Sequence, residues 1–348
     1  MSAKDNTAAL VPLAGSALPD ELVSRAADLV AKAEHHTRNA RAANTRRTYR
    51  AAWRTFETWC AAFRVPPLPA SHATIKAYLS DRAETVSRAS LDHALAAIVA
   101  EHKANGLHFD RKHPDFADFW TGLSRHKAAA PKQADPLLVG DLRTLLRFLG
   151  HDLRAIRDKA ILALGFSAAL RRSELAGLDL GPGGDGEGWI DVRTDGVLIT
   201  LRRSKASQDE AETIAVPRSG TETCAVALVE AWIAEAQIAP GTAVFRPIWK
   251  GGRLRNGRLT AESVSDIVRA RILEDGLATG VSREEAERRA ARFSGHSMRA
   301  GLATSAAQAG ANEFEIRSQT RHKSVEMVGR YVRLATRFDN NVLRKVGL

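Results

Sequence analysis

Six side chains spaced from residue 171 onward could together cleave a phosphodiester bond without a metal ion. They are two arginines, a lysine, two histidines and a tyrosine: Arg171, Lys205, His296, Arg299, His322 and Tyr331. A phenolic oxygen can act as a nucleophile, and an imidazole can move the proton that the phenol gives up. Guanidinium groups neutralise the charge that develops on phosphate oxygens. Each residue type also has an ordinary structural use, so its context decides.

Arg171 and Glu174 are three residues apart and share a helix face. On a surface, such an ion pair stabilises a protein very little. Arg171, however, follows the apolar segment 160–170, which is typical of a core helix. A partly buried arginine needs a carboxylate partner. We therefore expect Glu174 to orient Arg171, with an exposed ion pair as the alternative.

Lys205 lies in a polar turn between two predicted strands. An exposed turn lysine needs no special role, and that is the ordinary interpretation. The tip of a hairpin can also reach into a groove and deliver a proton to a leaving oxygen. Lys205 is therefore a candidate general acid.

His296 and Arg299 share a helix face at a spacing of three residues. The alanine- and glycine-rich stretch 300–310 follows and predicts close helix packing. A capping histidine beside a surface arginine is the ordinary alternative. The sequence has no HExxH motif and no carboxylate at ligand spacing here, so we predict no metal.

His322 and Tyr331 are nine residues apart, which is about two and a half helical turns. On one unbroken helix they would point in opposite directions. Ser324 is a plausible N-cap, so we expect His322 to precede a helix that carries Tyr331. The alternative is a packed aromatic side chain beside Val328 and Val332.

The composition is typical of a soluble globular protein with a polyanionic partner. The chain has 348 residues, enough for two domains, with 44% hydrophobic residues and a formal net charge of +11. Nucleic acid and anionic membrane both fit this charge, but no apolar run is long enough to span a membrane. Cys60 and Cys224 lie in apolar helical patterns, which predicts buried free thiols and a reducing compartment.

The expected fold is mainly α, a two-domain arrangement with one small antiparallel β-sheet. Three strands are predicted, at 189–193, 197–203 and 213–216. The expected domains are a disordered tail (1–20), a helical domain (21–127), an exposed linker with a proline at either end (128–136), and a mainly helical domain that carries the sheet (137–348).

An amphipathic helix is predicted over residues 45–63. Its apolar stripe is expected to be core and comprises Tyr49, Trp53, Phe56, Cys60 and Phe63. Six arginines occur within 17 residues without one acid: Arg38, Arg41, Arg46, Arg47, Arg50 and Arg54. Most charge runs are solvated faces. Because the planar guanidinium suits phosphate, we interpret this run as a DNA-binding surface.

The order of these residues resembles the tyrosine recombinase (phage integrase) family over about residues 40–346. Arg171-x-x-Glu174-Leu175 is similar to its first arginine box and His296-x-x-Arg299 to its second. The remaining matches are the β-hairpin Lys205, His322, and Tyr331 at the family's nine-residue offset. Residues 44–54 look most like the first DNA-clamping helix of Cre-like members. Arg321 departs from the pattern, because many integrases have glycine there; it could add a phosphate contact or restrict the loop.

The resemblance implies a site-specific recombinase that cuts and rejoins duplex DNA through a 3′-phosphotyrosyl intermediate. Tyr331 would be the nucleophile, Arg171 and Arg299 the phosphate clamps, and Lys205 the general acid. His296 would take the tyrosine proton, His322 would donate to a phosphate oxygen, and Glu174 would orient Arg171. No ATP, metal or cofactor is implied.

The implied partner is double-stranded DNA with an inverted-repeat site, bound as a clamp by a protein that is monomeric when free and tetrameric on two synapsed sites. The implied location is the cytoplasm, at the nucleoid, and not a membrane. Two alternatives remain open: a type IB topoisomerase-like or telomere-resolving enzyme, and a non-catalytic DNA-binding protein. The apolar tail residues Phe338, Val342, Leu343 and Val346 could dock on a neighbouring protomer or on their own domain.

Overall fold

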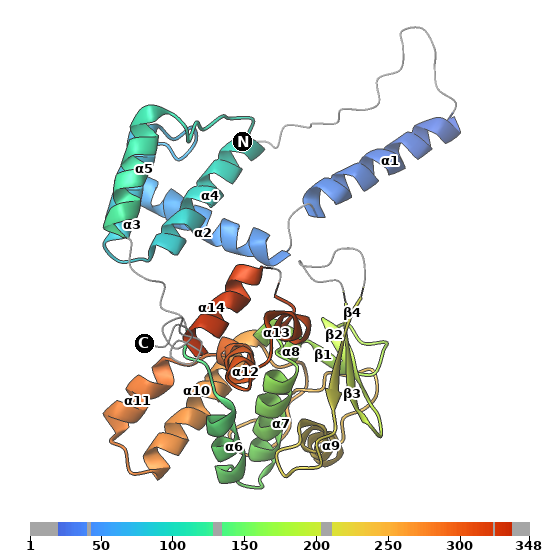
Figure 1. Cartoon of the computed structure of the whole chain (residues 1–348). Helices are drawn as coiled ribbons and strands as arrows, with labels where there is room; N and C mark the ends of the chain where they lie inside the picture. The colour runs from blue at the N-terminus through green and yellow to red at the C-terminus, as the bar shows by residue number, and fades with distance from the viewer. Residues whose placement is uncertain (1–19, 40–42, 128–133, 203–210, 323, 336–348) are drawn as a thin grey trace. The chain divides into compact units, whose positions relative to one another are not determined.

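The computed structural model describes residues 20–39, 43–127, 134–202, 211–322 and 324–335. The chain divides into two compact units, Met1–Pro131 and Lys132–Leu348. The prediction of a mainly helical protein with one small sheet is confirmed (Figure 1). Within the described ranges, no helix is long and apolar enough to cross a membrane.

The described part of the N-terminal unit is entirely helical. Its helices are α1 (Asp20–Asn39), α2 (Ala43–Ala62), α3 (His72–Ala83), α4 (Arg88–Ala104) and α5 (Pro114–His126). Serine side chains begin two of them: Ser71 and Ser87 accept hydrogen bonds from the backbone of α3 and α4. Helix α2 packs against α4, and α3 packs against both α4 and α5.

Three residues of the apolar stripe of α2 belong to this core, and two do not. Trp53, Phe56 and Cys60 are buried, whereas Tyr49 is half-buried beside the ring of His93. Phe63 was expected in the core but is 62% exposed. Helix α2 ends at Ala62, so Phe63 leaves the helical register of the stripe, and its ring packs on the half-buried Trp59 (centroids 4.4 Å apart).

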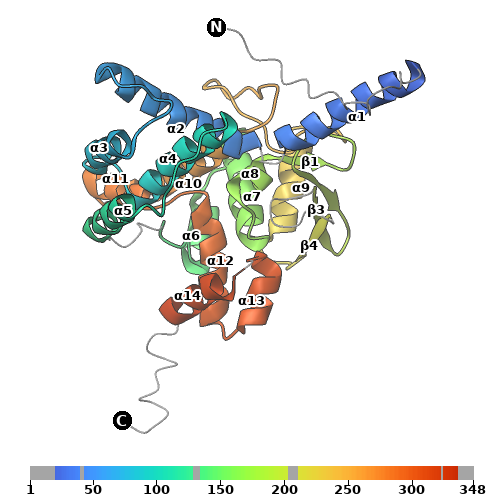
Figure 2. The same cartoon turned by 90° about the horizontal axis from the view of Figure 1, so that it is seen from above.

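The C-terminal unit packs its helices around α7 and carries its sheet at one side (Figures 1 and 2). Its described helices are α6 (Val139–Phe148), α7 (Leu153–Ser167), α8 (Arg172–Ala176), α9 (Ala225–Glu235), α10 (Ala261–Ala278), α11 (Arg283–Ala291), α12 (His296–Gln308), α13 (Glu313–Thr320) and α14 (Val325–Ala335). Helix α9 packs on α7 and on the sheet, between the two (Figure 2). The buried thiol of Cys224 precedes α9, and with Cys60 it confirms the prediction of two buried free thiols.

The sheet has four strands in the order β1-β2-β3-β4 and is mixed, not antiparallel as predicted. The strands are β1 (Leu178–Leu180), β2 (Gly188–Val192), β3 (Gly196–Leu201) and β4 (Glu212–Pro217). The last three pair antiparallel and confirm the predicted strands, whereas β1 adds in parallel to β2. Strand β1 is only three residues long and centres on the buried Asp179, which Arg258 and the Gly186 backbone satisfy. Neither feature gives a strand signal.

Helix α12 occupies the middle of the C-terminal unit, in contact with α6, α7, α13 and α14. Its small residues permit these contacts, as the sequence predicted. A Cβ atom at Gly301 would lie 1.8 Å from the carbonyl oxygen of Leu137. The Leu137 backbone also donates to the carbonyl of Ser297 (2.9 Å), so the beginning of the unit is fastened to α12.

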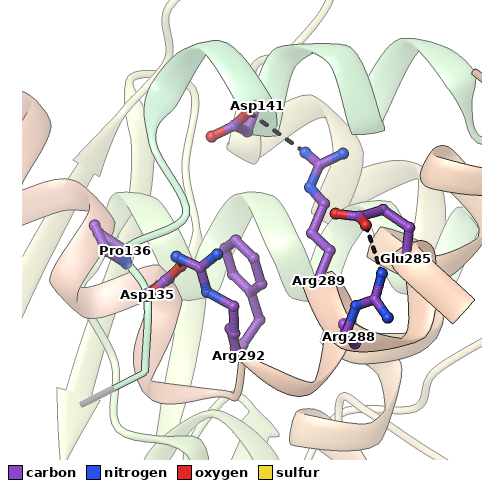
Figure 3. Close-up of a pocket in the computed structure, with 8 residues that line it drawn as sticks. Asp135, Pro136, Asp141, Glu285, Arg288, Arg289 and Arg292 are labelled. Atoms are coloured by element: carbon purple, nitrogen blue, oxygen red, sulfur yellow. Dashed lines mark hydrogen bonds and ion pairs between the residues drawn. The ribbon is translucent and has the colours of Figure 1, made fainter. Parts of the chain in front are cut away.

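Residues 134–136 were expected to be exposed linker but are half-buried. The backbone of Asp135 donates to the carbonyl of Arg292 (2.8 Å), and their side chains form an ion pair of 2.5 Å. Both line a pocket of about 610 Å³ beside α11 (Figure 3). The rest of the predicted linker, 128–133, lies outside the described residues.

Candidate active site

Five of the six candidate side chains lie together in the C-terminal unit. Arg171 immediately precedes α8, and His296 and Arg299 lie on the first turn of α12. His322 falls between α13 and α14, and Tyr331 lies on α14. The prediction that His322 precedes the helix of Tyr331 is confirmed. Lys205 lies outside the described residues.

The phenol of Tyr331 faces the imidazole of His296. Tyr331 Oη lies 3.3 Å from His296 Nε2. The pKa of His296 is lowered by burial of its ring among packed groups and by the charges of Arg299 and Arg171. His296 is therefore neutral near pH 7 and can accept a proton from the phenol.

His322 is a buried neutral imidazole with a defined tautomer. The Thr320 hydroxyl donates its only hydrogen to the carbonyl of Ile316 (2.6 Å), so it must accept from His322 Nδ1 at 2.7 Å. His322 Nε2 is then a lone-pair acceptor, and Arg299 Nε lies 3.4 Å from it. Burial first, and then the neighbouring charge of Arg299, lower the pKa of His322 to about 4.

Arg299 is a buried cation, with only 2% of the residue exposed. Its Nη1 donates to the carbonyl of Ala169, just beyond the end of α7, at 2.8 Å. Burial, together with the charges of Arg171 and Arg321, lowers the pKa of Arg299 to about 10. The guanidinium remains charged at neutral pH but is held among like charges, which is favourable for a site that awaits an anion.

Arg171 and Glu174 form a supported pair rather than an exposed one. Arg171 Nη1 lies 2.5 Å from Glu174 Oε1, and the Arg171 backbone donates to Glu174 Oε2 at 2.9 Å. The Glu174 side chain is only 8% exposed, whereas that of Arg171 is 39% exposed. Glu174 is thus a buried carboxylate that orients a guanidinium open to solvent.

Arg321 provides the second partner of Glu174, a contact that sequence reasoning missed. Arg321 Nη2 lies 2.7 Å from Glu174 Oε2, and Nη1 lies 3.0 Å from Glu212 Oε2 at the start of β4. Burial alone would raise the pKa of Glu174, but the hydrogen bonds and charge of Arg321, aided by Arg171, lower it overall. Of the two roles considered for Arg321, the buried side chain fits restriction of the loop and not contact with a phosphate. The only sequence signal was an arginine where glycine is usual.

The arginine run of the N-terminal unit is described in part. Arg46 is half-buried on α2, and Arg47, Arg50 and Arg54 are exposed there. Arg38 belongs to α1 without a described side chain, and Arg41 lies outside the described residues. In the described portion of the chain, no group of His, Cys, Asp and Glu side chains could hold a metal ion.

Comparison with known proteins agrees with this arrangement. The profile of the phage integrase family matches residues 137–337. An integrase/recombinase XerD homolog of Selenomonas ruminantium is 33% identical over 323 residues, covering 90% of this chain and 89% of that protein. The chain belongs to the phage integrase family. It is a tyrosine recombinase, a site-specific recombinase/integrase that acts on DNA.

Solved structures of other tyrosine recombinases share its fold. The Tn1549 transposon integrase, in complex with transposon right-end DNA, superposes with a TM-score of 0.56 at 17% identity, covering 92% of this chain and 99% of that one. The XerH recombinase, bound to a palindromic difH substrate in a post-cleavage complex, gives a TM-score of 0.51 at 14% identity, covering 80% and 72%.

Proposed function

We propose that Tyr331 is the nucleophile of this recombinase and attacks the scissile phosphate. The new bond joins Tyr331 Oη to phosphorus, and the bond to the 5′-oxygen breaks, which leaves a 3′-phosphotyrosyl link and a 5′-hydroxyl. The observation that carries the proposal is the 3.3 Å approach of Tyr331 Oη to His296 Nε2. The neutral His296 accepts the phenolic proton.

Arg171 and Arg299 bind the non-bridging oxygens of that phosphate and neutralise the charge that develops on them. Arg171 suits this role because its side chain is 39% exposed and its guanidinium is held in place by Glu174. Arg299 suits it because it is a buried cation next to His296, the histidine that faces Tyr331.

His322 has one role in the free protein and another in the DNA complex. Its Nε2 lone pair accepts from Arg299 in the free protein. Donation from Nε2 to a phosphate oxygen needs a second proton on the ring. A bound phosphate supplies the negative charge that favours this protonation, so His322 becomes a donor only when DNA is present.

Lys205 protonates the departing 5′-oxygen, as the resemblance implies. The chemistry exchanges one phosphodiester for another of similar energy, so neither ATP nor a metal ion is required. The reverse attack by a 5′-hydroxyl rejoins the strand and returns Tyr331 to its free state.

The N-terminal unit holds the DNA, with the arginines of α2 on its phosphates. Residues 44–54 look like the corresponding helix of Cre, which supports a Cre-like grip. The XerH and Tn1549 complexes contain recombination-site or transposon-end DNA. A lambda integrase fragment is a dimer on its core site. By analogy, we place this protein in the cytoplasm, as a free monomer and a tetramer on two inverted-repeat sites.

Four segments complete the proposed architecture: the tail 1–20, the core-binding domain 21–127, the linker 128–136 and the catalytic domain 137–348. The last three linker residues, 134–136, are attached to the catalytic domain through Asp135. Residues 338–348, with Val342, Leu343 and Val346, dock on a neighbouring protomer. These C-terminal residues lie outside the described ranges, so the support for docking is their apolar spacing alone.

A suicide substrate tests the chemistry. A nick placed so that the 5′-hydroxyl fragment diffuses away should trap wild-type protein on the 3′ end of DNA. Tyr331→Phe should bind the same DNA and form no adduct, because only the nucleophilic oxygen is removed. An adduct that persists in Tyr331→Phe would overturn the assignment. Relaxation of plasmid that lacks the site would instead favour a topoisomerase-like activity.

A further inference from the structure

We propose that Arg321 is a positioning residue that holds the Glu174 carboxylate, and through it Arg171, in the geometry needed for cleavage. The proposal rests on the phosphate-binding role proposed above for Arg171. Arg321 itself touches no reacting atom, because its side chain is only 5% exposed and faces two carboxylates.

The contacts form a chain of charges from β4 to the reaction site. Arg321 Nη1 lies 3.0 Å from Glu212 Oε2, and Arg321 Nη2 lies 2.7 Å from Glu174 Oε2. The other oxygen of Glu174, Oε1, lies 2.5 Å from Arg171 Nη1. Arg171 and Arg321 occupy the two oxygens of Glu174. With Arg321 removed, Glu174 would keep only its bonds to the backbone and the guanidinium of Arg171, so its carboxylate would be held less firmly.

The backbone conformation of Arg321 does not require an arginine, which indicates that the side chain is what matters at this position. Arg321 ends α13 in the left-handed region, with φ of 56°, which glycine adopts without strain. Its Nε is buried and has no hydrogen-bond partner among the described residues. Glycine would relieve both costs. The compensating gain of the arginine is therefore its bond to the two carboxylates.

The same residue controls the direction of the chain into His322. The Arg321 backbone donates to the carbonyl of Arg317 (2.7 Å), and Arg317 Nε donates to the carbonyl of His322 (3.0 Å). A substitution by glycine keeps this turn possible, so its main effect is on Glu174. A defect in Arg321→Gly can then be assigned to the lost side chain.

The first test compares Arg321→Gly with Arg64→Gly. Arg64 is a matched control because it also has a left-handed backbone (φ of 55°) and lies exposed beyond the end of α2. Arg321→Gly should slow single-turnover cleavage by about a hundredfold, the usual consequence of a misplaced catalytic group. Its affinity for a half-site should stay within about threefold of the Arg64→Gly value, because Arg321 contributes no phosphate contact. Equal loss of affinity and cleavage, or unchanged cleavage, would overturn the proposal.

A double-mutant cycle tests the route through Glu174. The effects of Arg321→Gly and Glu174→Gln on the cleavage rate should be strongly non-additive, because each removes the same orienting bond to Arg171. Glu212→Gln leaves the Arg321–Glu174 bond intact and should have the smaller effect. Additive effects of Arg321→Gly and Glu174→Gln would show that Arg321 acts elsewhere. Should Arg321→Gly fail to fold, Arg321→Lys provides the same cycle with the charge retained and one of the two bonds lost.

The pH profile provides a readout that general loosening would not change. Three cations act on the Glu174 carboxylate, namely Arg171 at α8, Arg321 after α13 and Arg299 on α12, and Glu212 on β4 shares Arg321 with it. Removal of Arg321 takes away the hydrogen bonds and the charge that oppose the effect of burial most strongly, so the pKa of Glu174 should rise. The acid limb of the cleavage rate should then move to higher pH in Arg321→Gly and stay in place in Arg64→Gly. An unmoved limb would contradict the proposal.

A substrate with a 5′-bridging sulfur separates failure of this inference from failure of the proposed function. Its thiolate leaving group needs no protonation, so it should rescue Lys205→Ala and not Arg321→Gly. Rescue of Arg321→Gly would place the defect at the leaving group and overturn the positioning role. If Lys205→Ala is not rescued, the general acid was misassigned. The double-mutant cycle of Arg321 and Glu174 does not depend on that result and tests the positioning role separately.

Discussion

His322 Nε2 and Arg299 Nε face each other at 3.4 Å, with the histidine as acceptor and the arginine as donor. This direction follows from the Thr320 hydroxyl, which is committed to Ile316 and leaves His322 Nδ1 as the donor on the other side of the ring. The free recombinase thus keeps one of its cations on a neutral imidazole. In the proposed complex, the scissile phosphate competes with His322 for that cation.

The pair predicts an unusual titration of His322. Because its pKa falls from 6.5 to about 4 on folding, its contribution to stability is complete above pH 6.5 and is lost as pH falls toward 4. The contribution is at most about 3 kcal/mol. His322→Gln should flatten the fall in unfolding free energy across that interval, and NMR should show a neutral, Nδ1-protonated ring at pH 6. A His322 resonance that titrates near 6.5 would contradict the arrangement.

Arg171 and Arg299 should matter far more for chemistry than for binding, because the proposed mechanism assigns them to one phosphate among the many that the protein contacts. Alanine at either position should leave half-site affinity within about tenfold, or ~1.4 kcal/mol, while abolishing cleavage. Gel-shift titration and the suicide substrate measure the two effects on the same DNA. A parallel loss of affinity would point to a structural role, most of all for the buried Arg299.

The arginines of α2 should act through phosphates. Each of Arg46, Arg47, Arg50 and Arg54 that contacts one should, as alanine, reduce the salt-dependence slope of binding by about one unit. Affinity measured over a series of salt concentrations gives this slope. An unchanged slope in all four variants would identify the run as a solvated face, whereas loss at one base position only would indicate base readout.

Gly301 should not tolerate a methyl group. An alanine Cβ would lie 1.8 Å from the backbone oxygen of Leu137, so either α12 or the chain at residue 137 must move. We expect Gly301→Ala to lose about 1–3 kcal/mol of unfolding free energy and to cleave DNA poorly. Gly122→Ala in α5 is the matched control: nothing lies within 4 Å of its Cβ, and it should gain up to about 1 kcal/mol. Equal melting temperatures for the two variants would contradict the close contact.

Local patterns predicted the elements better than the contacts between them. Periodicity predicts α2, and the hairpin turn at 194–196 predicts β2 and β3, because each signal depends on a few neighbouring residues. Phe63 fits the period but follows the last residue of its helix, and β1 is too short to alternate. The Glu174–Arg321 bond joins residues 147 positions apart, and no local rule reaches that distance. The spacing of His322 and Tyr331 placed both residues correctly but could not show that His322 is an acceptor.

The attachment of residues 135–137 gives the recombinase a mechanical property. Asp135 is bonded to Arg292 and Leu137 to Ser297, and the second of these lies one residue after His296. Tension on the chain that enters this unit is therefore resisted first at Arg292, just after α11, and then at Ser297, in the first turn of the helix that carries His296 and Arg299. Helix α12, which carries His296 and Arg299, therefore also helps to hold the segment 135–137 in place.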